Sequence, residues 1–241
     1  MPDPSPRGSG SNGSTGTGNL TVTTSASPLA GDHLYILVNV NNSSSGSHPT
    51  PASTGFSSLG SSTASVWSRL TLLGKIASGS EGTSYTISGF SGADAKYAAV
   101  VIVQDAGAGL ASNIVTTPDA SSNTTASIPA ITMATSGGLD VAALGLGGNN
   151  AGAVSNFSAW GSSLVEQIDG AQDSGGSSYY AGVGIATAVR VSAGLQAATS
   201  ATQGFSDVNA AIRFEVPPAT SATKPLPPRR RPYRFFGGLI R

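Results

Sequence analysis

The sequence of 241 residues contains no cysteine. Disulfide bonds, thiolate metal sites and thiol nucleophiles are therefore excluded, and cysteine usage says nothing about the redox compartment. Charge is scarce as well, since only 10% of the residues are Asp, Glu, Lys or Arg. A surface of long helices joined by Glu–Lys pairs needs more charge than this, so the composition argues against a helical protein.

Long apolar runs are also missing. No stretch approaches the roughly 18 consecutive apolar residues of a membrane-spanning helix. The first ten residues, MPDPSPRGSG, lack the apolar centre of a signal peptide. We therefore expect a protein that is made in the cytoplasm and has no membrane anchor.

The motifs of common enzyme classes do not occur either. The chain has no G-x-S-x-G elbow, no P-loop and no H-E-x-x-H zinc motif. Of its two histidines, His33 heads an apolar run, which is typical of a structural histidine, and His48 lies in a Ser/Gly loop without a neighbouring ligand. The carboxylates are scattered, so only a catalytic pair assembled from distant strands stays open. We predict no enzymatic activity, no cofactor and no metal site.

Short strand-like runs separated by Gly-rich turns fill the chain from residue 20 to residue 216. The run at 31–40, GDHLYILVNV, is apolar on both faces in its first half, which indicates a strand covered on both sides. By contrast, residues 41–65 predict a long surface loop that Phe56 and Leu59 attach to the core. Further strands are expected at residues 20–24, 66–76, 83–88, 96–104, 124–133, 139–146, 164–168, 179–189 and 208–216.

No segment of ten or more residues shows an apolar period of 3.6, so no long helix is expected. Many short strands without crossover helices favour antiparallel pairing. The prediction is an all-β fold, with one antiparallel β-sandwich domain of the jelly-roll type over residues 19–216. Residues 1–18 are mainly Gly, Ser, Thr and Asn and have almost nothing to bury, so we expect them to form a flexible leader.

Residues 217–241 differ in kind from the rest. They contain six of the twelve basic residues and no acidic one, so this arm carries a charge of +6 and residues 1–216 carry −6. A proline-rich spacer at 217–228 precedes an arginine cluster and an apolar end. Such an asymmetry indicates a partner for the arm. The predicted docking residues are Arg229, Arg230, Arg231, Tyr233, Arg234, Phe235, Phe236, Leu239 and Ile240.

Three functions fit such an arm. It could bind nucleic acid through arginines and stacked aromatic rings, lie on a membrane surface, or dock into another protein. We favour protein docking over nucleic acid and membrane. Five large apolar residues among the last nine fit buried anchors, whereas a merely solubilising tail does not need them.

Two tryptophans invite a carbohydrate-stacking interpretation. Trp67 is followed by a strand-like run with three leucines, so it is expected to anchor the core. Trp160 lies between Phe157 and Gly161 in a loop-like stretch, and it is therefore the candidate for an exposed sugar platform.

The run at 31–38, GDHLYILV, begins a pattern that resembles β-sandwich proteins from the structural gene clusters of tailed bacteriophages. In that group a G-D-x-L strand is followed by a Pro-then-Gly-Trp element, a strand ending in Lys or Arg, an apolar strand and a closing strand. Phe56 stands where tryptophan is usual in that element. The matching stretches are residues 51–59, 66–76, 96–107 and 209–216.

The resemblance implies a virion structural protein: a head-decoration, fibre or tail-associated protein located in the virion. Its arm would bind a shell, neck or tail protein. A second copy of the chain is a further candidate partner. The alternative is a host-receptor or glycan-binding module of a phage tail, which would contact host-surface sugar through residues 48–59 and 149–161.

Overall fold

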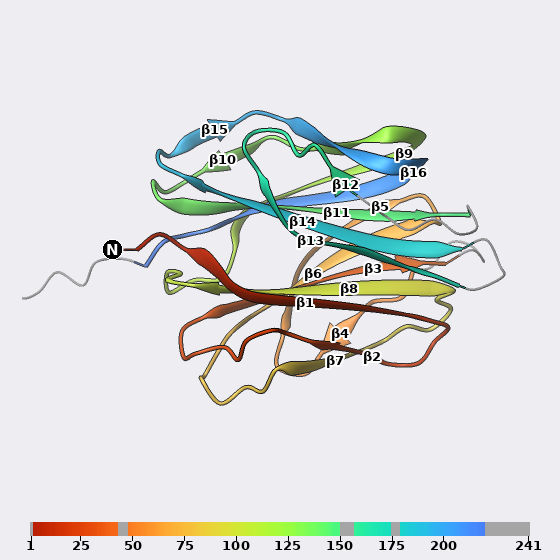
Figure 1. The fold of residues 1–241 in the computed structure, drawn as a ribbon, viewed down its shortest axis with the longest axis horizontal. Helices are drawn as coiled ribbons and strands as arrows, with labels where there is room; N and C mark the ends of the chain where they lie inside the picture. Colours follow the sequence, from red (N-terminus) through yellow and green to blue (C-terminus); the bar gives the residue numbers. More distant parts are fainter. Residues whose placement is uncertain (1, 43–47, 150–156, 175–178, 220–241) are drawn as a thin grey trace, which may run out of the picture.

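The computed structural model describes residues 2–42, 48–149, 157–174 and 179–219, in which all regular structure is β (Figure 1). The predicted arm therefore lies outside the described residues, except for residues 217–219. The strands are β1 (Ser5–Thr15), β2 (Leu20–Thr23), β3 (His33–Asn41), β4 (Ala52–Ser53), β5 (Ser57–Ala64), β6 (Ser68–Ile76), β7 (Ser84–Ser88), β8 (Ala95–Gln104), β9 (Ser112–Ile128), β10 (Ile131–Met133), β11 (Gly138–Gly148), β12 (Phe157–Ser158), β13 (Val165–Asp173), β14 (Tyr180–Arg190), β15 (Gly194–Gln196) and β16 (Thr199–Val216).

Two large antiparallel sheets pack face to face. The first has the strand order β1-β8-β3-β6-β5, and the second has the order β9-β16-β11-β14-β13 with β12 paired to the start of β16. Smaller sheets, β2-β7-β4 and β10-β15, lie on the two outer sides, so Figure 1 shows a stack of layers. The predicted antiparallel all-β sandwich is confirmed, while its jelly-roll connectivity stays a prediction.

The two large sheets repeat one strand order when β9 is aligned with β1. Strands β1 to β8 make one unit, and strands β9 to β16 make a second. In the large sheet of each unit, the third strand (β3 or β11) lies between the eighth strand (β8 or β16) and the sixth strand (β6 or β14). The pairings start in the same way, because His33 faces Val103 and Ile76 while Leu139 faces Val216 and Val189. The described residues thus form two successive eight-strand units, which the sequence pattern did not predict.

Strand β3 is buried along its whole length, because its two faces belong to different cores. Tyr35 and Leu37 pack into the core between the two large sheets. Leu34 and Ile36 pack into the core between the first large sheet and β2-β7-β4. The prediction of a strand covered on both sides is therefore confirmed.

The predicted flexible leader is wrong for residues 5–15, which form β1 and pair with β8. This edge strand contributes backbone hydrogen bonds and few apolar side chains, so its sequence has no strand-like alternation. Its glycines serve a purpose, because a Cβ at Gly10 would overlap with the carbonyl of Thr23 in the next layer.

The loop predicted at 41–65 is wrong for β4 and β5. Strand β5 is an edge strand whose Ser, Gly and Thr side chains are mostly exposed, so composition alone resembles a loop. The two anchors were predicted correctly. Leu59 packs against the core between the two large sheets, and Phe56 packs against the core between the first large sheet and β2-β7-β4.

A cluster of charged side chains is buried on the outer face of the second large sheet. Asp140 and Arg213 are fully buried, and Arg213 donates from Nε and Nη2 to the two carboxylate oxygens at 2.9 and 2.8 Å. Arg190 donates to the same carboxylate from Nη2 at 2.7 Å. Arg213 also donates from Nη1 to the carbonyls of Pro129 and Ala197, which flank β10 and β15. The cluster therefore fixes the small outer sheet.

The two large sheets approach each other closely at Gly147, so we expect a side chain at this position to destabilise the fold strongly. A Cβ at this buried position of β11 would overlap with the carbonyl oxygen of Trp67. Gly147→Ala is therefore expected to lower the free energy of unfolding by about 1–3 kcal/mol. Urea unfolding measures this, with Gly109→Ala as the control because its Cβ would meet nothing within 4 Å. Equal stabilities of the two variants would contradict the close packing.

Candidate functional site

The start of the arm is held against the body. Residues 217–219 run antiparallel to residues 105–107, in the loop after β8, through a bridge between Ala106 and Pro218. The Gly107 amide donates to the carbonyl of Pro217 at 2.7 Å, and the Ala219 amide donates to the carbonyl of Asp105 at 3.0 Å. The predicted docking residues, from Arg229 to Ile240, lie outside the described residues, so the anchor role stays a prediction.

Buried His33 supports this arm root, by which we mean residues 217–219 and their partners 105–107. Its Nε2 lies 2.8 Å from the carbonyl of Gly107, and its Nδ1 lies 3.0 Å from the hydroxyl of Tyr35. A carbonyl only accepts, so Nε2 carries the proton and Nδ1 accepts from Tyr35. Burial lowers the pKa of His33, which keeps the ring neutral. His33 is structural, as predicted.

Both ends of the described body lie together. A Cβ at Gly137 would lie 2.8 Å from Asp3 Oδ1 and 4.0 Å from Pro218 Cγ. Figure 1 accordingly shows the N-terminus and the end of β16 at the same end of the sandwich. The opposite end is marked by Asn41, whose side-chain amide donates to the carbonyl of Gly148 at 2.8 Å. The body therefore has one end from which the arm continues and one end opposite to it.

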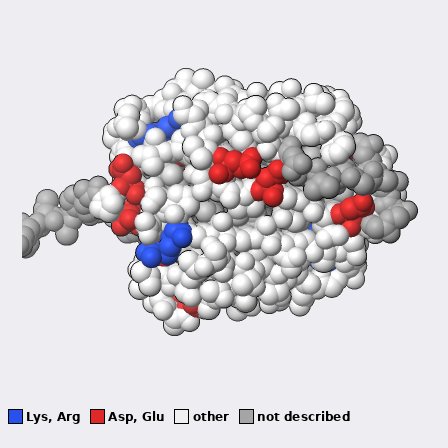
Figure 2. Space-filling view, viewed as in Figure 1, with Lys and Arg blue, Asp and Glu red and all other residues white. Residues whose placement is uncertain are grey.

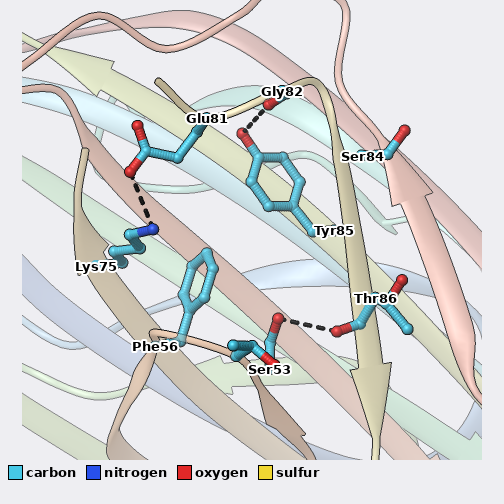
Figure 3. A pocket seen from close by; sticks show the side chains of 9 residues that line it. Ser53, Phe56, Lys75, Glu81, Gly82, Ser84, Tyr85 and Thr86 are labelled. Atoms are coloured by element: carbon cyan, nitrogen blue, oxygen red, sulfur yellow. Dashed lines mark hydrogen bonds and ion pairs between the residues drawn. The ribbon is translucent and has the colours of Figure 1, made fainter. Parts of the chain in front are cut away.

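A second candidate site is a hollow of about 230 Å³ beside β7 (Figure 3). Three segments form it: the end of β4 with the β4–β5 connection, the end of β6, and the β6–β7 turn with β7. Figure 3 shows Phe56, Lys75 and Tyr85 converging around it. The lining residues are Ser53, Thr54, Phe56, Lys75, Glu81, Gly82, Ser84, Tyr85 and Thr86.

An ion pair forms one wall of the hollow. Lys75 Nζ lies 2.9 Å from Glu81 Oε1. The amides of Ser78 and Gly79 donate to the same carboxylate at 2.9–3.0 Å. These backbone hydrogen bonds, above all from Ser78, and Lys75 hold the pKa of Glu81 well below its ordinary range. The wall therefore presents two opposite, fixed charges.

Aromatic rings form another wall. Phe56 and Tyr85 meet edge to face with ring centroids 6.0 Å apart. The Tyr85 hydroxyl donates to the carbonyl of Gly82 at 3.0 Å, and burial raises its pKa. Ser53 Oγ donates to the carbonyl of Thr86 at 2.9 Å. Apolar rings, hydroxyl groups and a mutually neutralised ion pair suit a neutral polar ligand better than an ion.

Glu81→Gln is expected to lower the free energy of unfolding by about 1 kcal/mol at pH 7, because a partly exposed carboxylate loses charge-assisted hydrogen bonds. The folded pKa of Glu81 lies below its ordinary value of 4.5. Its contribution is thus fully present above pH 4.5 and is lost as the pH falls towards the folded pKa. Thermal unfolding of both proteins between pH 8 and roughly pH 3 tests this. A difference in Tm that grows at acid pH would contradict it.

The two tryptophans lie in different settings. Trp67 packs against the core between the large sheets, as predicted, and stacks on Tyr179 with centroids 5.8 Å apart. Trp160 is partly buried against Phe157, and its Nε1 donates to Glu166 Oε2 at 2.9 Å. Trp160 follows β12 as Phe56 follows β4 in chain order, but β12 pairs with β16 of the large sheet whereas β4 pairs with β7 of the small one. The role of Trp160 as a sugar platform stays a prediction.

Comparisons with protein-family profiles, curated proteins and solved structures give no match for this chain. In the described ranges, no group of three or more His, Cys, Asp or Glu side chains could hold a metal ion. The same ranges hold no helix that is long and apolar enough to cross a membrane. Function must therefore be argued from the chain's own residues.

Most residues of the hollow could not be recognised from the sequence. Ser53 and Phe56 lie in the stretch 48–59 that was proposed for glycan contact, but Lys75, Glu81 and Tyr85 carried no signal. Lys75 lies near the end of β6, Glu81 lies in the next turn and Tyr85 lies in β7. Each of these residue types is common in a strand or a turn, so none of them marks a binding site by itself. One available cue was Glu81 between Ser80 and Gly82, where a carboxylate often accepts turn amides.

Proposed function

We propose that the chain is a non-enzymatic structural protein of a bacteriophage virion, either a capsid-decoration or fibre protein or a tail-associated one. Its β-sandwich body is displayed on the particle, and its basic, aromatic arm anchors it there. One observation carries the proposal: the arm root is hydrogen-bonded to the body at a single end. The +6 arm therefore continues from a fixed point of a low-charge body.

The surface of the body fits display. Figure 2 shows a face that is mostly uncharged, with acidic and basic side chains in small groups. In the partner we expect an acidic rim for the arginines and apolar pockets for the aromatic residues, because buried aromatic side chains and arginine dominate docking interfaces. A shell, neck or tail protein of the virion is the partner proposed.

Removal of residues 220–241 tests the anchor. Virions produced with the truncated chain are expected to carry at least about tenfold less of it, since losing even one hot-spot residue costs 2 kcal/mol or more. Thermal unfolding of the truncated body should change by no more than about 0.5 kcal/mol, because the removed residues follow the arm root. A chain with residues 220–241 scrambled is the matched control for charge. Normal incorporation of the truncated chain would overturn the proposal.

A second candidate function, host-receptor or glycan binding, is favoured by one observation. The hollow beside β7 combines aromatic walls with hydroxyl groups and a neutral ion pair. Display and glycan binding are compatible, because the arm root and the hollow use different residues.

A further inference from the structure

We propose that the hollow beside β7 binds one neutral pyranose ring of a glycan. This inference deepens the second candidate function and does not rest on the arm. It assigns the ligand class, the contacting side chains and the unit of the fold that binds.

The size of the hollow selects the ligand. A volume of about 230 Å³ lies below the roughly 300–1,000 Å³ of sites for drug-sized ligands. One six-membered sugar ring fits this space, whereas the rest of a longer glycan would extend into solvent.

Charge selects a neutral ligand. Lys75 and Glu81 stand 2.9 Å apart, so an anionic ligand would meet the carboxylate and a cationic one the ammonium group. An ammonium group has three N–H donors, and Glu81 takes one of them. Two donors of Lys75, together with the hydroxyl group of Ser53 as an acceptor, can therefore bind sugar hydroxyls. The hydroxyls of Ser84 and Thr86 pair with Thr23 and Thr21 of β2 instead.

The aromatic wall explains why the ligand is expected to contain a pyranose ring. Phe56 is half-buried, and the buried Tyr85 supports it edge-on, so Phe56 supplies the apolar ring surface at the hollow. The C–H face of a pyranose is apolar and packs on such surface while its hydroxyls reach polar groups. A site with one apolar aromatic wall and one polar wall suits a sugar better than it suits water or a purely apolar ligand.

The lining is fixed before a ligand arrives. Glu81 is held by the amides of Ser78 and Gly79, the Tyr85 hydroxyl by Gly82, and the Ser53 hydroxyl by the carbonyl of Thr86. Fewer side-chain rotamers then need to be frozen on binding, which favours affinity for a small ligand.

The second unit lacks this arrangement. Trp160 corresponds to Phe56 in chain order only, because β12 pairs with β16 and not with β15, and its Nε1 is bonded to Glu166. Strand β15, the counterpart of β7, reads Gly-Leu-Gln and has no aromatic residue to set against it. Binding should therefore depend on Phe56 and not on Trp160.

Saturation-transfer NMR of the full chain tests the proposal. The probes are methyl glycosides of glucose, galactose, mannose, rhamnose, N-acetylglucosamine and N-acetylgalactosamine, with the anionic methyl glycoside of N-acetylneuraminic acid for comparison. At least one neutral probe is expected to bind with a Kd on the order of 1 mM, the affinity of a ligand of about a dozen heavy atoms at typical efficiency. Absence of transfer to every neutral probe, or binding of the anionic one alone, would overturn the proposal.

Substitutions locate the site. Phe56→Ala and Lys75→Met are each expected to raise the Kd of the methyl glycoside that binds at least about tenfold, which is the effect of losing one well-placed contact. Trp160→Ala, and Phe205→Ala at an exposed aromatic residue on β16, should leave the Kd unchanged. If Phe56→Ala does not fold, Lys75→Met decides. Loss of binding in Trp160→Ala with retention in Lys75→Met would move the sugar to the second unit and refute the assignment. Virion incorporation is measured separately, so either proposal can fail alone.

Discussion

Replacement of Asp140 by alanine is expected to lower the free energy of unfolding by about 3–5 kcal/mol. Arg213 is fully buried and makes a two-pronged contact with this carboxylate. Removing the carboxylate leaves the guanidinium buried with only the carbonyls of Pro129 and Ala197, and Arg190 loses the same partner. Most of the loss is the cost of an uncompensated buried charge.

Urea unfolding measures the effect, and a second variant separates its cause. Asp140→Leu combined with Arg213→Met removes the fully buried pair and should recover part of the lost stability, because well-packed apolar residues often replace a buried ion pair without loss. The rest stays lost because Arg190 still lacks its carboxylate partner. A loss below about 1 kcal/mol for Asp140→Ala would contradict the buried pair, since that is the range of exposed ion pairs.

Under the proposed docking of the arm, replacement of Phe235 and Phe236 by serine is expected to weaken binding of the full chain to purified virions about 1,000-fold, since two aromatic anchors buried in a partner contribute at least 2 kcal/mol each. Replacement of Arg229, Arg230 and Arg231 by serine should cost less, because exposed ion pairs contribute about 0.2–1 kcal/mol each. The arginine contribution should also shrink with added salt, while the aromatic contribution should not.

Binding at low and high salt, with Leu226→Ala in the spacer as the control, tests this division between the two parts of the arm. If wild-type binding falls steeply with added salt and the replacement of Phe235 and Phe236 does not weaken it, the partner is nucleic acid instead of a protein. That result would contradict protein docking.

Strands with two buried faces can be predicted from the sequence, and β3, β6, β8, β11 and β14 were. Their β-branched, aromatic and small apolar residues between Gly-rich turns are typical of a covered strand. Edge strands β1 and β5 could not be predicted, because an edge strand can consist of Gly, Ser and Thr that contribute backbone hydrogen bonds alone. The repeat of two eight-strand units is a property of pairing, and pairing leaves no trace in the composition of single segments.

The candidate sites divide in the same way. The arm stands out in sequence because charge and proline are local properties of one segment. The hollow does not stand out, because Lys75 and Glu81 are brought to Phe56 by the folding of β6 and β7 onto the β4–β5 connection. His33 is intermediate: its burial follows from the apolar run around it, but its partner Gly107 is 74 residues away.

The central claim is that the body is attached through the end that carries the arm root. Cryo-electron microscopy of the protein bound to its particle tests this most directly, because the sandwich can be oriented by fitting its layers. We predict that the end with Ala106 and Pro218 faces the particle and that the end with Asn41 and Gly148 points away from it. A body whose Asn41 end contacts the particle, with Pro218 facing solvent, would contradict it.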